Sequence, residues 1–407
     1  MTITPSTLNG DFDKSTIADL VATYGSSSTT AWLEFERYKI WSPSIPIPES
    51  RVPPHGWLFA WGNPLVSSPS ALAPTAKEFV KFAEENELHP VFACVDSQLE
   101  EILGEQLGWR TVSCIYEDYI DPAHLIELTL PENKGQEGQH AVKDLKKNLM
   151  RAEKYNVVDK RAIEQGVEDW KKSRSGIQIA STTLQPWLDQ EHRRYWVARQ
   201  EGEIVGILIL TPVQANNWQI KNAVAFPKAP KGTSEVLIYT SLQGLHAGNS
   251  SPRSRSPSPA GPARNGTNGV TSTVTSSAPT PSSMTVEPPT SDAGSGIISD
   301  DASGLSGVAT PSPIEEPDYS PLDDENCVVV TFGISASPEL HPVHNLGGWK
   351  VKALSKTYKK VASSAKLINR GEFRRKFDSE HKPMYVCYPA DGFGLDGINT
   401  LFKLLKK

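Results

Sequence analysis

Cationic side chains cluster just before a strand-like segment near the C-terminus. Arg374 and Lys376 lie in a turn between two phenylalanines, and Pro383 then excludes a helix because proline lacks an amide N–H and fixes φ. Residues 384–388 alternate and are rich in aromatic and β-branched side chains, which predicts a strand. Arginine and lysine at such a point suit a polyanionic ligand that carries phosphates. A solvated surface turn explains the same residues equally well.

Composition and charge limit the classes of partner. The 407-residue chain is long enough for two domains of ordinary size. Its net charge of −6 is uneven, because residues 1–130 carry 7 basic and 18 acidic side chains whereas residues 340–407 carry 14 basic and 5 acidic ones. The basic C-terminal region favours an anionic partner, either nucleic acid or lipid headgroups.

Cysteine spacing and hydropathy indicate the cellular compartment of the protein. The four cysteines are far apart and form no CxxC pair, which favours reduced thiols in an intracellular protein over a zinc site or disulfides. The first residues show no signal-peptide pattern, and no apolar run reaches the roughly 18 residues that a spanning helix needs. We therefore expect a cytoplasmic protein that meets lipid, if at all, as a peripheral protein.

The spacing of apolar residues predicts an α/β fold, because short strands alternate with helices. Ser97 and Glu100 are expected to form a capping box at the start of the second of these helices. A strand is expected to begin within residues 31–40. The other expected strands are 57–61, 90–95, 109–119, 196–200, 204–211, 218–226 and a segment from 327, and the expected helices are 75–87, 97–107 and 236–246.

Residues 248–325 interrupt this pattern. They are rich in serine, proline, glycine and threonine and hold few aromatic residues, so they lack the apolar surface that a folded core requires. We predict a disordered insertion whose Ser256 and Ser258, each followed by proline, are candidate phosphorylation sites.

Residues 371–389 resemble the C-terminal domain of bacterial phosphatidylglycerol lysyltransferases, in which a basic run and Lys-Phe precede Pro-x-Tyr-x-x-Tyr. The resemblance continues at the turn Gly62-Asn63-Pro64, at the acidic pair Glu117 and Asp118, and in the loop from Pro230 to Leu237. Two departures are Arg375, where that family usually carries an acid, and His381, where it usually carries tryptophan. The resemblance implies two tandem acetyltransferase-like (GNAT) folds and transfer of an amino acid from aminoacyl-tRNA to a lipid.

The resemblance, together with the insertion, also implies a domain organisation. We expect an N-terminal GNAT-like domain at 1–135, a basic linker helix at 136–158, and a catalytic GNAT-like domain formed by 159–247 and 326–407 around the insertion. The linker helix carries a basic stripe beside an apolar one, and in the family such a helix is expected to face tRNA. An ordinary solvated lysine face is the alternative. The expected tRNA-binding residues are Lys143, Lys147, Arg151, Lys154, Lys228 and Lys231.

The reaction that the resemblance implies defines the expected site. An aminoacyl ester is already activated, so proximity, a cation at the carbonyl oxygen and a base at the acceptor hydroxyl are sufficient. No Ser–His–Asp or nucleophilic cysteine pattern stands out, which favours direct transfer. Aminoacyl-tRNA is the expected co-substrate, and no cofactor or metal is expected. The candidate catalytic residues are the cations Arg374 and Lys376 and the bases His381 and Glu235, and the expected substrate pocket includes Phe377 and Tyr385.

Three functions remain open at this point. A free-standing form with an insertion resembles the fungal branch that attaches glycine to the 3β-hydroxyl of ergosterol, and phosphatidylglycerol is the alternative acceptor. An acyl-CoA N-acyltransferase is disfavoured because the loop at Gly232 lacks the second small residue of the pyrophosphate-binding motif. A GNAT-like pair without catalytic activity, acting as an RNA or membrane adaptor, is the third.

Overall fold

All residues that the computed structural model describes belong to one unit of the chain. The described ranges are 12–44, 56–133, 160–173, 184–214, 216–250, 328–347 and 373–393, with residues 142, 143, 145, 351, 355, 356, 358, 397 and 400. The predicted insertion and most of the predicted linker helix lie outside these ranges.

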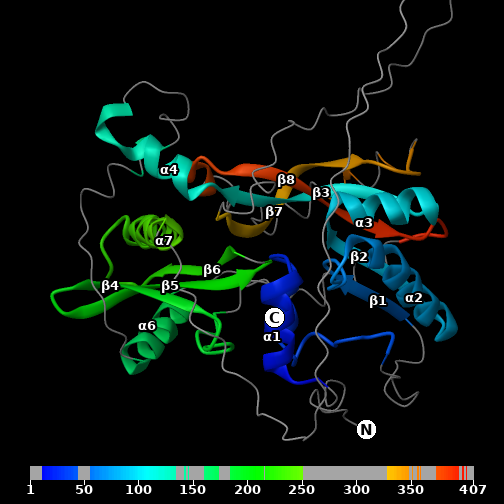
Figure 1. The fold of residues 1–407 in the computed structure, drawn as a ribbon, viewed down its shortest axis with the longest axis horizontal. Coiled ribbons are helices and arrows are strands. Elements are labelled where there is room, and N and C mark those ends of the chain that lie inside the picture. The colour runs from blue at the N-terminus through cyan, green and yellow to red at the C-terminus, as the bar shows by residue number, and fades with distance from the viewer. Residues whose placement is uncertain are drawn as a thin grey trace, which may run out of the picture. The chain divides into compact units, whose positions relative to one another are not determined.

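Eight strands form a single sheet in the order β1-β2-β8-β3-β7-β6-β5-β4 (Figure 1). Their bounds are β1 Gly56–Trp61, β2 Leu88–Val95, β3 Arg110–Ile120, β4 Arg194–Gln200, β5 Glu203–Val213, β6 Asn217–Ala225, β7 Val330–Pro342 and β8 Glu380–Tyr388. The helices are α1 Lys14–Tyr24, α2 Leu72–Glu85, α3 Ser97–Glu101, α4 Pro122–Thr129, α6 Lys160–Lys172 and α7 Thr233–Ser250. The expected α/β class is confirmed.

The C-terminal strand lies in the N-terminal half of the sheet. β8 pairs antiparallel with β2 on one side and with β3 on the other, and β7 pairs antiparallel with β3. The sheet therefore joins strands from both predicted domains. The boundaries predicted for those domains stay a prediction.

The two parallel pairs differ in length. β1 and β2 keep their register from Gly56–Leu88 to Trp61–Ala93, whereas β6 and β7 pair only at Trp218–Val330 and Gln219–Thr331. Beyond Gln219, β6 remains paired with β5, and β7 remains paired with β3. Two parallel strands therefore part between β7 and β6, the fifth and sixth strands in the order of the sheet.

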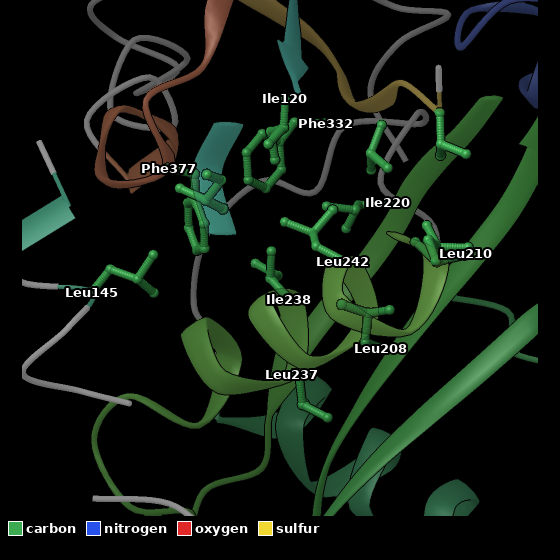
Figure 2. Close-up of a cluster of buried hydrophobic side chains, with 14 of the residues drawn as sticks. Ile120, Leu145, Leu208, Leu210, Ile220, Leu237, Ile238, Leu242, Phe332 and Phe377 are labelled. Atoms are coloured by element: carbon green, nitrogen blue, oxygen red, sulfur yellow. The ribbon is translucent and has the colours of Figure 1, made fainter. Parts of the chain in front are cut away.

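Helix α7 covers one face of this region. Its Ile238 and Leu242 point toward Ile120, Ile220 and Phe332 in the largest buried cluster (Figure 2). Gly206 on β5 allows this approach, because a Cβ there would lie 2.9 Å from the Thr233 side chain and from the Val224 carbonyl. A second cluster joins α2, α3, β2 and β8.

Local hydrogen bonding overturned two expectations about the first half of the chain. The strand expected within 31–40 is wrong, because Thr29–Leu33 forms a 3₁₀ turn (η2) whose Thr29 and Thr30 hydroxyls donate to the backbone carbonyls of Ser26 and Ser27. The capping box at Ser97 is also wrong, because Asp96 caps α3 by accepting from Leu99 N. Glu100 instead accepts from Thr111 Oγ1 inside the protein.

Candidate functional site

Asp118 on β3 is the centre of a buried polar group that we call the Asp118 cluster. Its carboxylate is fully buried and accepts hydrogen bonds from Arg374 Nη1, from His381 Nδ1 and, at 2.8 Å, from Ser335 Oγ. Tyr116 stacks on the His381 ring, with centroids 5.7 Å apart. The cluster thus contains Asp118, Arg374, His381, Ser335 and Tyr116.

Strand register explains why these residues meet. Asp118 is directly opposite His381 on β8 and opposite Gly333 on β7, and opposed residues direct side chains to the same face of a sheet. Phe332 is an extra residue in the β7 ladder, and the next residue, Gly333, has a φ of +74°. The resulting bulge turns several backbone carbonyls out of the ladder.

Arg374 binds these carbonyls. Its Nη1 donates to Gly333 O at 2.8 Å, and its Nη2 donates to Phe332 O at 3.0 Å and Ile334 O at 3.3 Å. Arg374 is 8% exposed, and its guanidinium is hydrogen-bonded to the carbonyls of the bulge and to Asp118. This geometry makes Arg374 a residue that orients Asp118.

Electrostatics keep Asp118 ionised. Burial raises the pKa of its carboxyl group, but the hydrogen bond from His381 and the charge of Arg374 outweigh that effect, so the pKa lies below its ordinary value. A carboxylate that accepts from His381 Nδ1–H leaves Nε2 as the proton acceptor. The His381 side chain is 40% exposed, so an acceptor hydroxyl can reach it. A base oriented in this way is suited to deprotonating an alcohol.

The other two candidate catalytic residues form a separate pair. Lys376 Nζ lies 3.1 Å from Glu235 Oε1, and the ammonium also sits over the Phe373 ring at 5.4 Å. Glu235 is in the first turn of α7, where a carboxylate is favoured by the helix dipole. The structure thus divides the four predicted residues into Arg374 with His381 and Lys376 with Glu235.

The remaining predicted residues are dispersed. Lys228 and Lys231 are exposed in the loop before α7, and Lys143 is exposed as well. Lys147, Arg151 and Lys154 lie outside the described residues. Phe377 and Tyr385 are buried in different apolar clusters, at 0% and 8% exposure, so they do not line a common surface.

Sequence reasoning noted Asp118 only as half of an acidic pair and assigned it no role. The available signal is the acidic pair itself, Glu117 and Asp118, inside a predicted strand. Among the residues that the structure describes, no group of three or more His, Cys, Asp or Glu side chains is arranged to hold a metal ion.

Comparison with known proteins gives the family. The family model described as "Phosphatidylglycerol lysyltransferase, C-terminal" matches residues 21–249, more than half of the chain. The chain belongs to this family. The resemblance seen in the sequence is therefore confirmed. Membership makes the chain an aminoacyltransferase of the kind that transfers an amino acid from aminoacyl-tRNA to a lipid.

Two solved structures show the same fold over nearly the whole chain. The C-terminal domain of a lysylphosphatidylglycerol synthetase from Agrobacterium fabrum is 12% identical, with a TM-score of 0.53, and the match covers 97% of this chain and 98% of that one. L-PGS from Bacillus licheniformis is 11% identical, with a TM-score of 0.57 and coverage of 97% and 96%. These neighbours confirm the expected mixed α/β fold. No curated protein matches in sequence.

Helix length bears on membrane contact. Within the described residues, no helix is long and apolar enough to cross a bilayer.

Proposed function

We propose that this aminoacyltransferase moves glycine from glycyl-tRNA to the 3β-hydroxyl of a membrane sterol, ergosterol. The observation that carries the chemistry is the pairing of His381 with the buried Asp118 carboxylate. A sterol hydroxyl is a neutral, weakly acidic alcohol, and a positioned base lowers the barrier to its attack. The choice of sterol and glycine is supported by the resemblance to the fungal branch that attaches glycine to ergosterol. His381 also stands where the lysyltransferases usually carry tryptophan.

The proposed reaction needs one proton transfer in each direction. His381 Nε2 takes the proton of the sterol hydroxyl as the oxygen attacks the ester carbonyl of glycyl-tRNA. The new ester bond forms, the bond from the carbonyl carbon to the ribose oxygen breaks, and His381 returns the proton to that oxygen. Asp118 stabilises the imidazolium between these steps, and Arg374 keeps Asp118 in place.

Cationic groups supply the remaining contacts. Lys376 is the candidate for stabilising the negative charge on the carbonyl oxygen, because its ammonium is held beside Glu235 and remains 32% exposed. Lys143, Lys228 and Lys231 are exposed and are proposed to contact the tRNA backbone, together with Lys147, Arg151 and Lys154. The basic region 340–407 is proposed to hold the protein at the cytoplasmic surface of an anionic membrane.

An acceptor competition tests the proposal. Purified protein is incubated with labelled glycyl-tRNA and liposomes that contain ergosterol, phosphatidylglycerol or both, and the lipids are extracted and separated. We expect ribonuclease-sensitive label in the sterol fraction. Label in phosphatidylglycerol alone would show that this lipid, and not ergosterol, is the acceptor. Label that reaches lipid only from another aminoacyl-tRNA would show that glycine is not the transferred amino acid. The absence of label in any lipid with any aminoacyl-tRNA would favour the adaptor function.

A further inference from the structure

The ring of Tyr116 on β3 packs against the imidazole of His381 on β8. The two ring centroids are 5.7 Å apart and the ring planes are inclined by 24°, which is a stacked arrangement. In the strand register Tyr116 lies opposite Pro383, two residues from His381, so the two rings are diagonal neighbours on one face of the sheet. The contact involves the proposed base, and the reaction described above gives Tyr116 no role.

This stack distinguishes His381 from other histidines of the protein. His124, His192 and His344 also bind carboxylates. Within the part of the chain that the structure describes, none of these three has an aromatic ring stacked on it. A stacked ring is therefore not a general feature of the carboxylate-bound histidines in this fold.

Interruptions of the sheet place Tyr116 for this contact. Both neighbours of β3 shift their register between Ser113 and Ile115, so Cys114 is an extra residue two positions before Tyr116. Bulges of this kind redirect the side chains next to them. At the same level β7 leaves its ladder with β3, beginning with Ser337. The interruption on β7 thus brings Ser337 beside Tyr116.

The hydroxyl of Tyr116 is fixed at this point. Ser337 is fully buried, and its Oγ donates to Tyr116 Oη at 2.9 Å and accepts from Glu339 N at 3.1 Å. Tyr358 fastens the same backbone, because its hydroxyl lies 2.7 Å from the Ser337 carbonyl oxygen and 2.6 Å from that of Cys114. The end of the Tyr116 side chain is therefore tied to β7, while its ring lies against β8.

A single hydrogen bond does not fix an imidazole. The Asp118 carboxylate holds Nδ1 of His381, but it leaves the ring free to tilt about that contact, and 40% of the side chain is exposed. A ring packed on the face of the imidazole restricts this tilt, and catalysis by positioned groups is sensitive to displacements of about 1 Å. The electron-rich face of tyrosine also favours a cation, here the imidazolium that forms when His381 accepts a proton.

We propose that Tyr116 is a positioning residue for His381, an inference that rests on the proposed function. Asp118 fixes one ring nitrogen, and Tyr116 fixes the plane of the ring, so that Nε2 is directed at the acceptor hydroxyl. The ring of Tyr116 acts on His381, and the hydroxyl anchors that ring to Ser337. The competing explanation is a tyrosine that only fills space between the strands, which would lower stability without any dependence on His381.

Single-turnover transfer of glycine to ergosterol, with enzyme in excess, tests the proposal, because its rate constant does not depend on the folded fraction. We expect Tyr116→Leu to slow transfer at least about tenfold with unchanged affinity for glycyl-tRNA. Tyr116→Phe keeps the ring and Ser337→Ala keeps the tyrosine, so each is expected to lose no more than about threefold.

Tyr195→Leu is the matched control. Tyr195 lies on β4 at the edge of the sheet, where its ring packs on Trp187 with centroids 5.4 Å apart and its hydroxyl donates to Pro186 O at 2.8 Å. The substitution removes the same kinds of contact far along the sheet from His381. We expect it to lower stability and to keep the wild-type rate constant.

The decisive comparison repeats Tyr116→Leu in the His381→Ala background. A residue that acts through His381 causes no further loss there, whereas an independent residue lowers the rate by the same factor in both backgrounds. A wild-type rate in Tyr116→Leu, an equal loss in the two backgrounds, an equal loss in Tyr195→Leu, or a Tyr116→Phe enzyme as slow as Tyr116→Leu would overturn the positioning role and leave the function intact. A wild-type protein that transfers glycine to no lipid, or a His381→Ala enzyme as fast as wild type, would overturn the proposed function itself.

Discussion

The two halves of the sheet each contain a parallel pair of strands connected through a helix-containing segment, but the two pairs differ in the number of positions at which they are paired. β1 and β2 stay paired over six positions, and the residues packed on them are mainly apolar. β6 and β7 stay paired over two positions, and polar clusters lie on both faces of the region where they part. The difference shows that regular strand pairing is interrupted between β6 and β7.

Where two strands separate, their backbone N–H and C=O groups need other hydrogen-bond partners. At β7 the guanidinium of Arg374 takes the carbonyls of residues 332–334, and this fixes a charged side chain beside Asp118. At β1 and β2 the ladder itself satisfies the backbone, so no charged residue is required. We infer that the continuous pair mainly supports the fold and that the parted pair supports the chemistry.

A buried carboxylate that binds a histidine lies beside each parallel pair: Asp118 is opposite Gly333 of β7, and Glu100 is on α3, which packs on β2. Substitutions of the two carboxylates therefore test the comparison directly. Asp118→Asn leaves Arg374 buried without its counter-ion and His381 without its orienting acceptor. We expect it to lower the free energy of unfolding by about 3 kcal/mol and kcat at least about 100-fold. Chemical denaturation and lipid labelling measure the two effects.

Glu100→Gln is the matched variant beside the continuous pair β1 and β2. Glu100 accepts from Thr111 Oγ1 and, at 2.7 Å, from His344 Nδ1. We expect it to cost about 1–2 kcal/mol of stability with activity per folded molecule unchanged. An activity loss as large as that of Asp118→Asn would remove the distinction between the continuous pair and the parted pair.

The pH dependence sharpens this prediction. The folded-state pKa of Asp118 is lowered, so its contribution to stability is present above the unfolded value of about 3.9 and is lost as pH falls through the folded value. The stability difference between wild type and Asp118→Asn should therefore shrink in acid. A difference that stays constant from pH 7 to pH 2 would contradict an ionised Asp118.

A glycine substitution tests the parting point with a smaller effect. Gly333→Ala places a Cβ 2.5 Å from Gln219 Nε2 at a φ of +74°. We expect a loss of about 2 kcal/mol or more, because the contact adds to a left-handed strain of about 1–2 kcal/mol. Gly202→Ala, at a φ of +86° with no atom within 4 Å, should show the strain alone. Equal melting temperatures for the two variants would mean that Gly333 is not closely contacted.

The smallest expected effect lies away from the parting point, at His192. Burial lowers the pKa of His192, but its hydrogen bonds to Asp189 and Asp19 outweigh that effect and the pKa is raised. The stabilisation is therefore present below the ordinary value of about 6.5 and is lost as pH rises through the folded value. Because Asp19 is 70% exposed, we expect only about 0.5 kcal/mol. Asp19→Asn should reduce this pH dependence without changing activity, and an equal dependence in both proteins would contradict the bridge.

Local patterns predicted most elements but not their partners. The apolar runs of β2 and β5 and the turn between β4 and β5 were sufficient to predict strands and a hairpin. Nothing in the sequence of β8 indicates that it pairs between β2 and β3, since alternation specifies a strand and leaves its neighbours open. Helix α6 was missed, although its charged residues surround the apolar positions Ile163 and Val167.

The site was predictable in part for the same reason. Cations and a histidine near residue 375 were apparent from residue type and from the family resemblance. Their partner Asp118 is 263 positions from His381, and only the folded sheet brings them together.

Single-turnover transfer from labelled glycyl-tRNA to ergosterol, measured for wild type and His381→Ala, tests the central claim most directly. The account predicts that the rate of ester formation falls at least about 100-fold while the affinity for glycyl-tRNA is unchanged. His89→Ala, an exposed histidine on β2, should retain the wild-type rate. A His381→Ala enzyme that forms the ester at the wild-type rate would contradict the assignment of chemistry to the parted strands.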